Sequence, residues 1–229
     1  MRTRSTLLVA GAALAGLAAL AGCATGPLGG PGTLAGPRPE PVAATSTTSA
    51  AGTPVSTRVH PAPKPSPTVA KVQKWVKIYS GPAARHLTPN KVAGGKTHTI
   101  ELNATPNAQI GTYVADGAGR TLYRFDADKP GVSTCNGDCA KLWPPLLISS
   151  PGKIYPSGVT AKSISYIERA DHTCQVALDG HPLYYFALDA RPGQINGQGV
   201  NGTWFAVAPD GGKTRAVPGA LPGTAVPVN

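Results

Sequence analysis

The sequence lacks the short motifs by which common catalytic sites are recognised. It has no G-x-S-x-G element, no C-x-x-C pair and no H-x-x-x-H spacing. Residues 197–202 do spell G-x-G-x-x-G, but Pro-Gly precedes them and a strand-like segment follows, so the strand–helix context of a dinucleotide site is missing. These absences favour a protein that is not an enzyme and that has no cofactor.

Acidic residues are scarce, and this scarcity is uneven along the chain. The formal net charge is +10, with 21 Lys and Arg against 11 Asp and Glu. Residues 24–99 carry nine bases and one acid, whereas residues 100–229 carry ten of each. Binding of DNA or RNA would favour basic residues interleaved with aromatic ones on a folded surface, and that pattern is missing. We therefore expect no nucleic-acid partner.

The only long apolar run lies at the start of the chain. Arg2 and Arg4 precede the segment 7–20, and small residues then lead to Leu20-Ala21-Gly22-Cys23. This layout predicts a secretory signal over residues 1–22, because the run is short and rich in Ala and Gly. The cysteine after Leu-Ala-Gly resembles a bacterial lipobox. The resemblance implies acylation of Cys23, with palmitate among the expected chains, and anchoring to the outer face of the cell membrane. A plain secretory signal that is cut elsewhere is the alternative.

A basic tether is expected to follow the signal. Residues 24 to about 70 consist mostly of Gly, Pro, Ala, Thr and Ser, a composition that cannot bury enough apolar surface to offset chain entropy. We place a disordered tether at 23–96, including a weakly ordered stretch at 71–95 that Gly81-Pro82 and Pro89 interrupt. Its basic residues would attract anionic lipid or a cell-wall polymer, or would only keep the linker soluble and extended.

The sequence pattern of residues 97–211 predicts a small antiparallel, mostly β module, followed by a flexible tail at 212–229. Runs rich in β-branched and aromatic residues alternate with Gly, Pro, Asn and Asp, and no stretch of ten residues has a helical apolar period. One helical turn is the most that 138–142 could form. The expected strands are His98–Leu102, Thr112–Ala115, Thr121–Phe125, Ser163–Ile167, Thr173–Leu178, Leu183–Ala187 and Thr203–Ala208.

The module contains an internal repeat with an offset of 61 residues. The paired positions share Gly, Leu, Tyr, Phe, Asp and Trp, and each copy has Pro-Gly shortly after its Asp. In L-Y-x-F, Tyr and Phe fall on one face of a strand and Leu on the other. The motif residues are Leu122, Tyr123, Phe125, Asp128 and Trp143 in the first copy, and Leu183, Tyr184, Phe186, Asp189 and Trp204 in the second.

These residues carry a family resemblance. The Tyr-x-aromatic-x-x-Asp motif, followed by Trp one loop later, resembles the secreted lipoprotein-repeat family of predicted bacterial lipoproteins, which is common in actinobacteria. The resemblance covers about residues 110–209; the second copy lacks the cysteines and the Trp-Pro-Pro of the first. It implies an exported protein built from two divergent repeats, with no established activity.

The cysteines leave alternatives open. Cys135 and Cys139 flank a turn-forming Asn-Gly-Asp, so a structural disulfide is expected in an oxidising compartment. Alternatively, this pair could serve an envelope redox or metal-handling protein, with Cys174 and His172 completing a tetrahedral site. Otherwise Cys174 is expected to be a small buried apolar residue.

The repeat residues also admit a structural and a chemical interpretation. The aromatic side chains could line a ligand groove, and Asp128 and Asp189 could act as paired carboxylates of a hydrolase. We favour a core with two turn aspartates, because equivalent positions in a repeat indicate folding first. The sequence thus predicts a non-enzymatic binding or structural lipoprotein of the cell envelope, whose protein partner is unknown.

Overall fold

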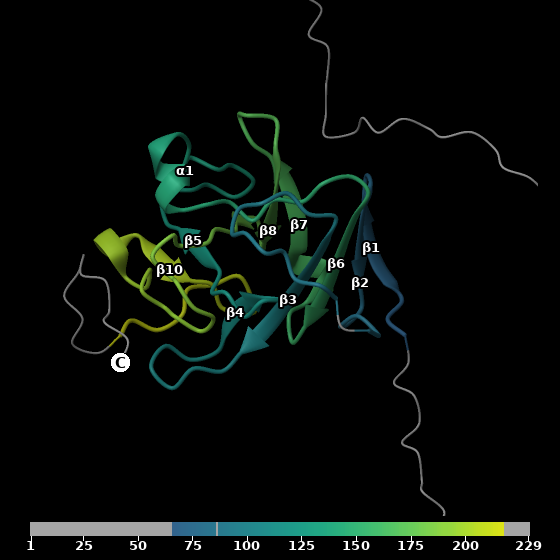
Figure 1. Cartoon of the computed structure of the whole chain (residues 1–229), viewed down its shortest axis with the longest axis horizontal. Coiled ribbons are helices and arrows are strands. Elements are labelled where there is room, and N and C mark those ends of the chain that lie inside the picture. Colours follow the sequence, from purple (N-terminus) through teal and green to yellow (C-terminus); the bar gives the residue numbers. More distant parts are fainter. Residues whose placement is uncertain (1–65, 86, 218–229) are drawn as a thin grey trace, which may run out of the picture.

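The computed structural model describes residues 66–85 and 87–217, which form a mostly β module (Figure 1). Its largest sheet contains five strands in the order β1-β2-β6-β3-β4. Smaller sheets pair β10 with β5 and join β7, β8 and β9. The strands are β1 (Val69–Gln73), β2 (Val76–Tyr79), β3 (Thr99–Thr105), β4 (Tyr113–Asp116), β5 (Tyr123–Phe125), β6 (Gly152–Ser157), β7 (Ile164–Glu168), β8 (Cys174–Leu178), β9 (His181–Pro182) and β10 (Trp204–Ala206).

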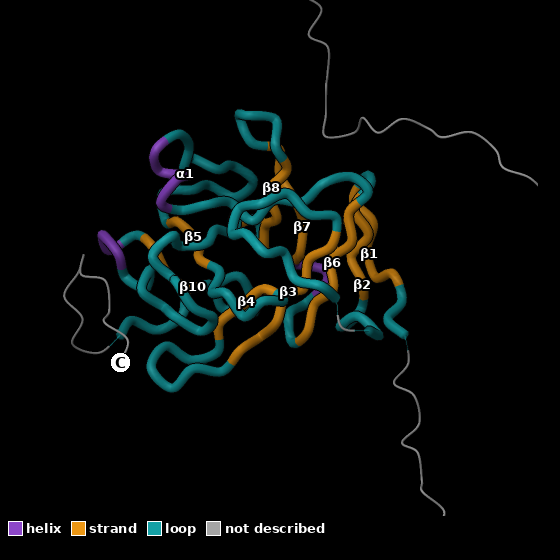
Figure 2. Tube along the Cα trace, viewed as in Figure 1, coloured by secondary structure: helices purple, strands orange, loops and turns teal. Residues whose placement is uncertain are grey.

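Within residues 66–85 and 87–217, helical structure is limited to short pieces between the strands. The α-helix α1 (Asp138–Leu142) is the single turn that the sequence allowed, and two 3₁₀ turns cover Ala161–Ser163 and Val200–Gly202. Long loops connect these elements (Figure 2). The expectation of a mostly β fold is confirmed.

The pairing is not antiparallel throughout. β6 lies between β2 and β3 and runs parallel to both, with Ile154 opposite Ile78 on one side and Ile100 on the other. The sequence analysis missed β6, because Gly152 opens it and Pro156 lies within it, and both residues are poor strand formers. The prediction of a strand at 183–187 is also wrong. The regular strand covers His181–Pro182, and Tyr184 makes only isolated bridges.

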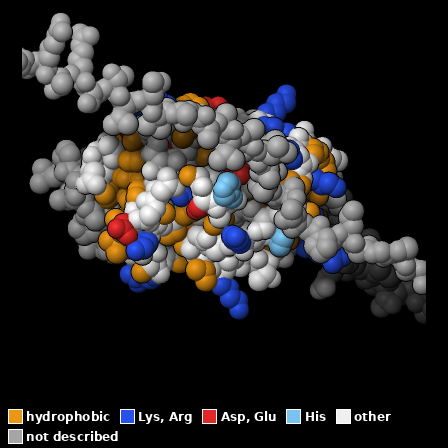
Figure 3. All heavy atoms as spheres, turned by 90° about the horizontal axis from the view of Figure 1, so that it is seen from above, with side chains coloured by type: hydrophobic (Ala, Val, Ile, Leu, Met, Phe, Trp, Pro, Cys, Tyr) orange, Lys and Arg blue, Asp and Glu red, His pale blue; other side chains and the backbone are white. Residues whose placement is uncertain are grey.

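Strand alternation builds two apolar clusters. Val76 and Ile78 in β2 and Leu102 in β3 are fully buried, and their neighbours along the strands are more exposed. They belong to a mainly aliphatic cluster, whereas a second cluster is mainly aromatic and surrounds Trp143 and Trp204. On the face shown in Figure 3, Lys and Arg side chains lie scattered among other atoms and do not form one continuous patch.

Both ends of the module lie outside the predicted boundaries 97 and 211. β1 and β2 form a hairpin within the large sheet, so the part of the expected tether from Val69 to Tyr79 is an ordered element. The interrupting Gly81-Pro82 comes after this hairpin and ends it. At the other end, Thr214 donates its backbone N–H to Ala206, and Arg215 donates to Ile110. The signal segment, Cys23 and residues 218–229 lie outside the described residues.

The edge strand β1 is joined to β7 by side chains. The Gln73 amide donates to the Tyr166 carbonyl at 3.0 Å and accepts from the Tyr166 backbone N–H at 3.0 Å. Lys71 Nζ adds bonds to the carbonyls of Lys162 and Ile164 at 3.0 and 2.9 Å. The Gln73 side chain thus takes the place of a neighbouring strand on the open edge of β7.

Replacing Gln73 with alanine should lower the free energy of unfolding by about 1–3 kcal/mol, because the backbone N–H and carbonyl of Tyr166 both lose their partner. Urea denaturation of the full chain measures the change. Val72→Ala is the matched control, since Val72 lies on the same strand with 58% of its surface exposed and should stay within about 0.5 kcal/mol. Equal losses in the two variants would show that the amide bridge does not contribute.

Candidate functional site

The two repeat tyrosines are bonded across the copies. Tyr123 Oη donates to Asp189 Oδ2, and Tyr184 Oη donates to Asp128 Oδ2, both at 2.6 Å. The backbones of the two tyrosines also exchange hydrogen bonds, at 2.8 and 2.9 Å. Each copy therefore supplies the carboxylate that holds the tyrosine of the other copy, and the contacts of the two tyrosines are reciprocal.

The two tryptophans meet between the copies. The rings of Trp143 and Trp204 are stacked with centroids 3.8 Å apart and an interplanar angle of 2°. Outside this pair, Phe186 stacks on Trp143 and Phe125 stacks on Trp204, each with a centroid separation of 4.2 Å. Four aromatic rings thus form one continuous stack to which the copies contribute alternately.

The Leu and Tyr residues of the motif lie in different clusters, as the alternation along the motif predicts. Leu122 and Leu183 are fully buried in the aliphatic cluster, whereas the tyrosines face the aromatic cluster. The glycine-rich loop has a packing role: a Cβ on Gly197 would lie 2.8 Å from ring atoms of Trp143 and Tyr123. The aromatic residues and Leu residues of the motif therefore form the core of the module.

The two repeat carboxylates differ in their surroundings. Asp128 is 6% exposed, and its Oδ1 accepts from both the backbone N–H and the hydroxyl of Thr134 at 2.7 Å. Asp189 Oδ1 accepts only the backbone N–H of Asn196 at 2.9 Å, and the Asn196 amide donates elsewhere, to the Leu188 carbonyl. Asp189 therefore has more free acceptor capacity than Asp128.

Burial raises the pKa of Asp189 to about 6, against the hydrogen bonds from Tyr123 and Asn196, which lower it. A carboxyl whose pKa is raised in the folded state stabilises the fold fully below its unfolded pKa of about 3.9, and that contribution is lost as the pH rises through about 6. Compared with the unfolded chain, the folded protein therefore favours the protonated, neutral form of the Asp189 side chain.

The difference in unfolding free energy between the native chain and Asp189→Asn should change by about 2 kcal/mol between pH 4 and pH 7, in the direction that favours the native chain at pH 4. Asparagine keeps an oxygen for the Tyr123 hydroxyl but does not titrate. Urea denaturation across this pH range measures the change. Parallel pH profiles of the two proteins would contradict the raised pKa.

Asp189 lines a pocket at the junction of the two copies. The pocket has a volume of about 380 Å³. Its walls come from three parts of the chain: residues 88–91, Ala118 and Arg120, and residues 189–192. A smaller hollow of about 20 Å³ shares Thr88, Pro89 and Asn90 and is lined by Asp116 and Tyr185. Sequence reasoning missed this site, because residues 88–91 lie in the expected tether.

The cysteine pair is a disulfide. Cys135 and Cys139 are bonded with a Cα–Cα distance of 5.2 Å, and Cys135 is 1% exposed. Cys174 is buried in β8, within the aliphatic cluster, and His172 contacts Glu168 on an exposed loop. Within residues 66–85 and 87–217, no group of three or more His, Cys, Asp or Glu side chains is placed to hold a metal ion. The predicted tetrahedral site is therefore not formed by these residues.

A buried arginine, which belongs to no motif in the sequence, holds the disulfide loop. Arg169 follows β7 and is 4% exposed. It donates to Ser133 Oγ and Gln175 Oε1 at 2.6 and 2.7 Å, and to Cys135 O and Asn136 Oδ1 at 2.8 and 2.9 Å. Ser133 in turn contacts the Tyr184 hydroxyl at 2.8 Å. These contacts favour a structural role for the disulfide loop.

Comparison with known proteins agrees with the repeat geometry. Residues 104–147 and 165–208 match a family described as a secreted repeat of unknown function. Equivalent positions of these two segments lie 61 residues apart, which is the offset of the Tyr, Asp and Trp pairs. No curated protein and no solved structure is significantly similar to the chain. Among the described residues, no helix has the length and apolar character needed to cross a membrane. Residues 104–147 and 165–208 thus belong, as two copies, to this family of secreted repeats.

Proposed function

We propose that this chain is an exported lipoprotein, held at the outer face of the cell membrane by acyl chains on Cys23, whose β module works by binding and not by catalysis. The match of both copies to a family of secreted repeats carries the proposal. The signal-like residues 1–22 and the Leu-Ala-Gly that precedes Cys23 support it. A doubly acylated cysteine gives a stable membrane anchor, whereas a single chain binds only marginally.

The motif residues contact one another and hold the two copies together, which supports a non-enzymatic module. The Tyr and Asp side chains bond one another across the copies, and the Trp residues are stacked between them. A hydrolase acting through Asp128 would need a carboxylate that is accessible to substrate. Asp128 instead accepts three hydrogen bonds from within the protein and is almost fully buried.

The basic stretch would assist the anchor. Nine basic residues and one acid lie between residues 24 and 99, and basic residues near an anionic membrane surface each contribute on the order of 1 kcal/mol before screening. The proposed partners are therefore the bilayer, through Cys23, and anionic lipid or cell-wall polymer, through this stretch.

Metabolic labelling with a palmitate analogue in a bacterial host tests the anchor. The native chain should be labelled and should fractionate with membranes. Cys23→Ala should lose the label and leave the membrane fraction, whereas the control Cys135→Ser/Cys139→Ser should keep both. An unlabelled native chain, or one found in the cytosol, would overturn the proposal.

A further inference from the structure

The pocket beside Asp189 is built from three separate parts of the chain. Residues 88–91 lie outside both family segments, Ala118 and Arg120 belong to the first copy, and residues 189–192 belong to the second. A volume of about 380 Å³ lies in the range of small-molecule sites, which occur preferentially where structural units meet. The junction therefore has the size and the placement of a ligand site.

Arg120 positions one wall of this pocket. Its guanidinium binds Asp116 Oδ2 through Nε and Nη2, at 2.8 and 2.6 Å. The same Nη2 donates to the backbone carbonyl of Asn90 at 2.7 Å. Because Asp116 neutralises Arg120, this arginine fixes the 88–91 segment against the first copy and contributes little net charge to the pocket.

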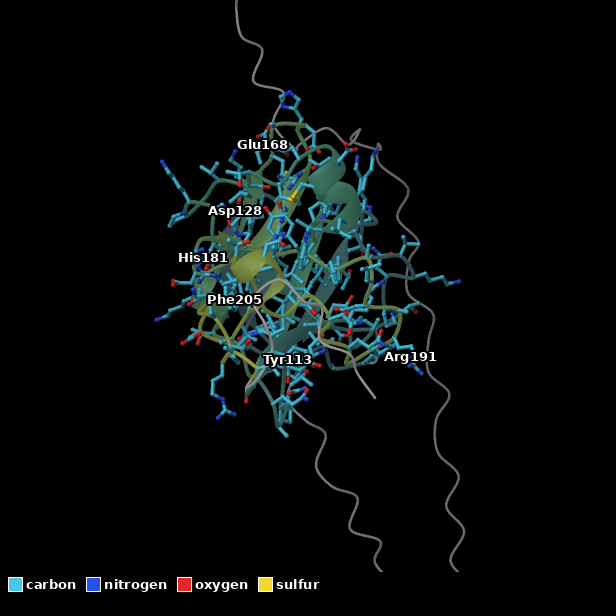
Figure 4. All side chains as sticks on the ribbon, turned by 90° about the vertical axis from the view of Figure 1, so that its left-hand side faces the viewer. Tyr113, Asp128, Glu168, His181, Arg191 and Phe205 are labelled. Carbon is cyan, nitrogen blue, oxygen red and sulfur yellow. A yellow bond between two sulfur atoms is a disulfide. The ribbon has the colours of Figure 1, made fainter. Side chains whose placement is uncertain are left out.

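Two other cations remain available at the pocket. Lys91 and Arg191 line it from two separate parts of the chain, and both are exposed. Within the part of the chain that the structure describes, neither makes an ion pair. Figure 4 shows Arg191 well away from Asp128. With Asp189 as the one unpaired carboxylate, the lining carries a net positive charge.

The rest of the lining suits a polyol better than a bare anion. Asp189 retains acceptor capacity beyond its bonds to Asn196 and Tyr123, so it can accept a hydrogen bond from a ligand hydroxyl. Apolar surface comes from Pro89, Ala118, Ala190 and Pro192, against which the C–H groups of a sugar ring can pack. A lining that contains one unpaired carboxylate and two unpaired cations does not suit a metal ion.

We propose that this pocket binds an anionic saccharide, a sugar that bears a phosphate or carboxylate group. Lys91 and Arg191 bind the acidic group, and Asp189 accepts a hydrogen bond from a sugar hydroxyl. This inference rests on the proposed function, because it names the ligand class of a binding module that faces the cell envelope.

Titration of the purified full chain with glucose 6-phosphate and with glucuronate, by calorimetry or by NMR, tests the site. Glucose and inorganic phosphate serve as the neutral and the non-saccharide probes. We expect saturable binding of both anionic sugars, at least about tenfold tighter than binding of either control probe, since charge-assisted hydrogen bonds and sugar packing act together.

The double variant Lys91→Ala/Arg191→Ala should bind both anionic sugars at least about tenfold more weakly with an unchanged urea midpoint, because both side chains are exposed. Lys129→Ala is the matched control, an exposed cation on the corresponding loop of the first copy, and should bind normally. Asp189→Asn should weaken binding of the sugars but not of inorganic phosphate.

Several outcomes would overturn the saccharide site: no saturable binding below about 10 mM, equal affinity for inorganic phosphate and glucose 6-phosphate, or equal losses in the Lys129 and Lys91/Arg191 variants. These measurements do not depend on acylation. An unlabelled Cys23 would therefore overturn the proposed anchor without affecting the binding result. Absence of sugar binding would likewise overturn the saccharide site without affecting the proposed anchor.

Discussion

Trp204→Ala should lower the free energy of unfolding by about 3–5 kcal/mol, the usual cost of removing a buried aromatic side chain. Trp204 is 3% exposed, and its ring lies between Trp143 and Phe125, at 3.8 and 4.2 Å. It also meets the Tyr184 ring edge-on, at 5.2 Å. Because the stack alternates between the copies, the loss should affect both copies together. Urea denaturation followed by Trp fluorescence and by far-UV circular dichroism measures it.

The equivalent substitution gives an internal comparison. Trp143→Ala should cost nearly the same, because Trp143 has Trp204 and Phe186 on its two sides, at 3.8 and 4.2 Å. Leu188→Ala is the control, since Leu188 is 59% exposed and should stay within about 0.5 kcal/mol of the native chain. Two separate transitions in Trp204→Ala, with one copy still folded, would contradict the shared core.

The sequence predicted which residues of the two copies are equivalent, but it did not predict which residues of one copy contact the other. The offset of 61 residues correctly paired Tyr123 with Tyr184 and Trp143 with Trp204. Tyr123 and Asp128 lie only five residues apart, so a contact within one copy was as compatible with the pattern as a contact across copies. The exchange of partners depends on the backbone pairing of the two tyrosines, a long-range contact that leaves no periodic signal.

The parts outside the repeat were the least predictable. β2 and β6 complete the sheet from non-repeated sequence. β2 has only four residues, and β6 begins at Gly152 and contains Pro156. Their burial comes from parallel pairing with one another and with β3, which no local pattern encodes. The pocket was missed for the same reason, because its wall at residues 88–91 is bonded to the first copy by the long-range contact between Arg120 and the Asn90 carbonyl.

Arg169→Met should cost at least about 3 kcal/mol of unfolding free energy. Methionine fills much of the space but donates no hydrogen bond, so the acceptors on Ser133, Gln175 and the Cys135 carbonyl lose a charged donor while they remain enclosed. The nearest carboxylate to Arg169 is Asp171 at 3.7 Å, and Asp171 is more than half exposed, so loss of this ion pair adds little. Urea denaturation of the full chain gives the value.

Arg191→Met is the matched control for Arg169→Met, because Arg191 is exposed and should be neutral within about 0.5 kcal/mol. The disulfide and Arg169 hold the same loop, so Arg169→Met combined with Cys135→Ser/Cys139→Ser should cost less than the sum of the separate changes. Removing either restraint already makes the loop mobile. Removing the second restraint then adds less freedom, and so costs less, than it would in the native chain. Full additivity would mean that Arg169 stabilises the fold through Gln175 in β8 and not through the loop of the first copy.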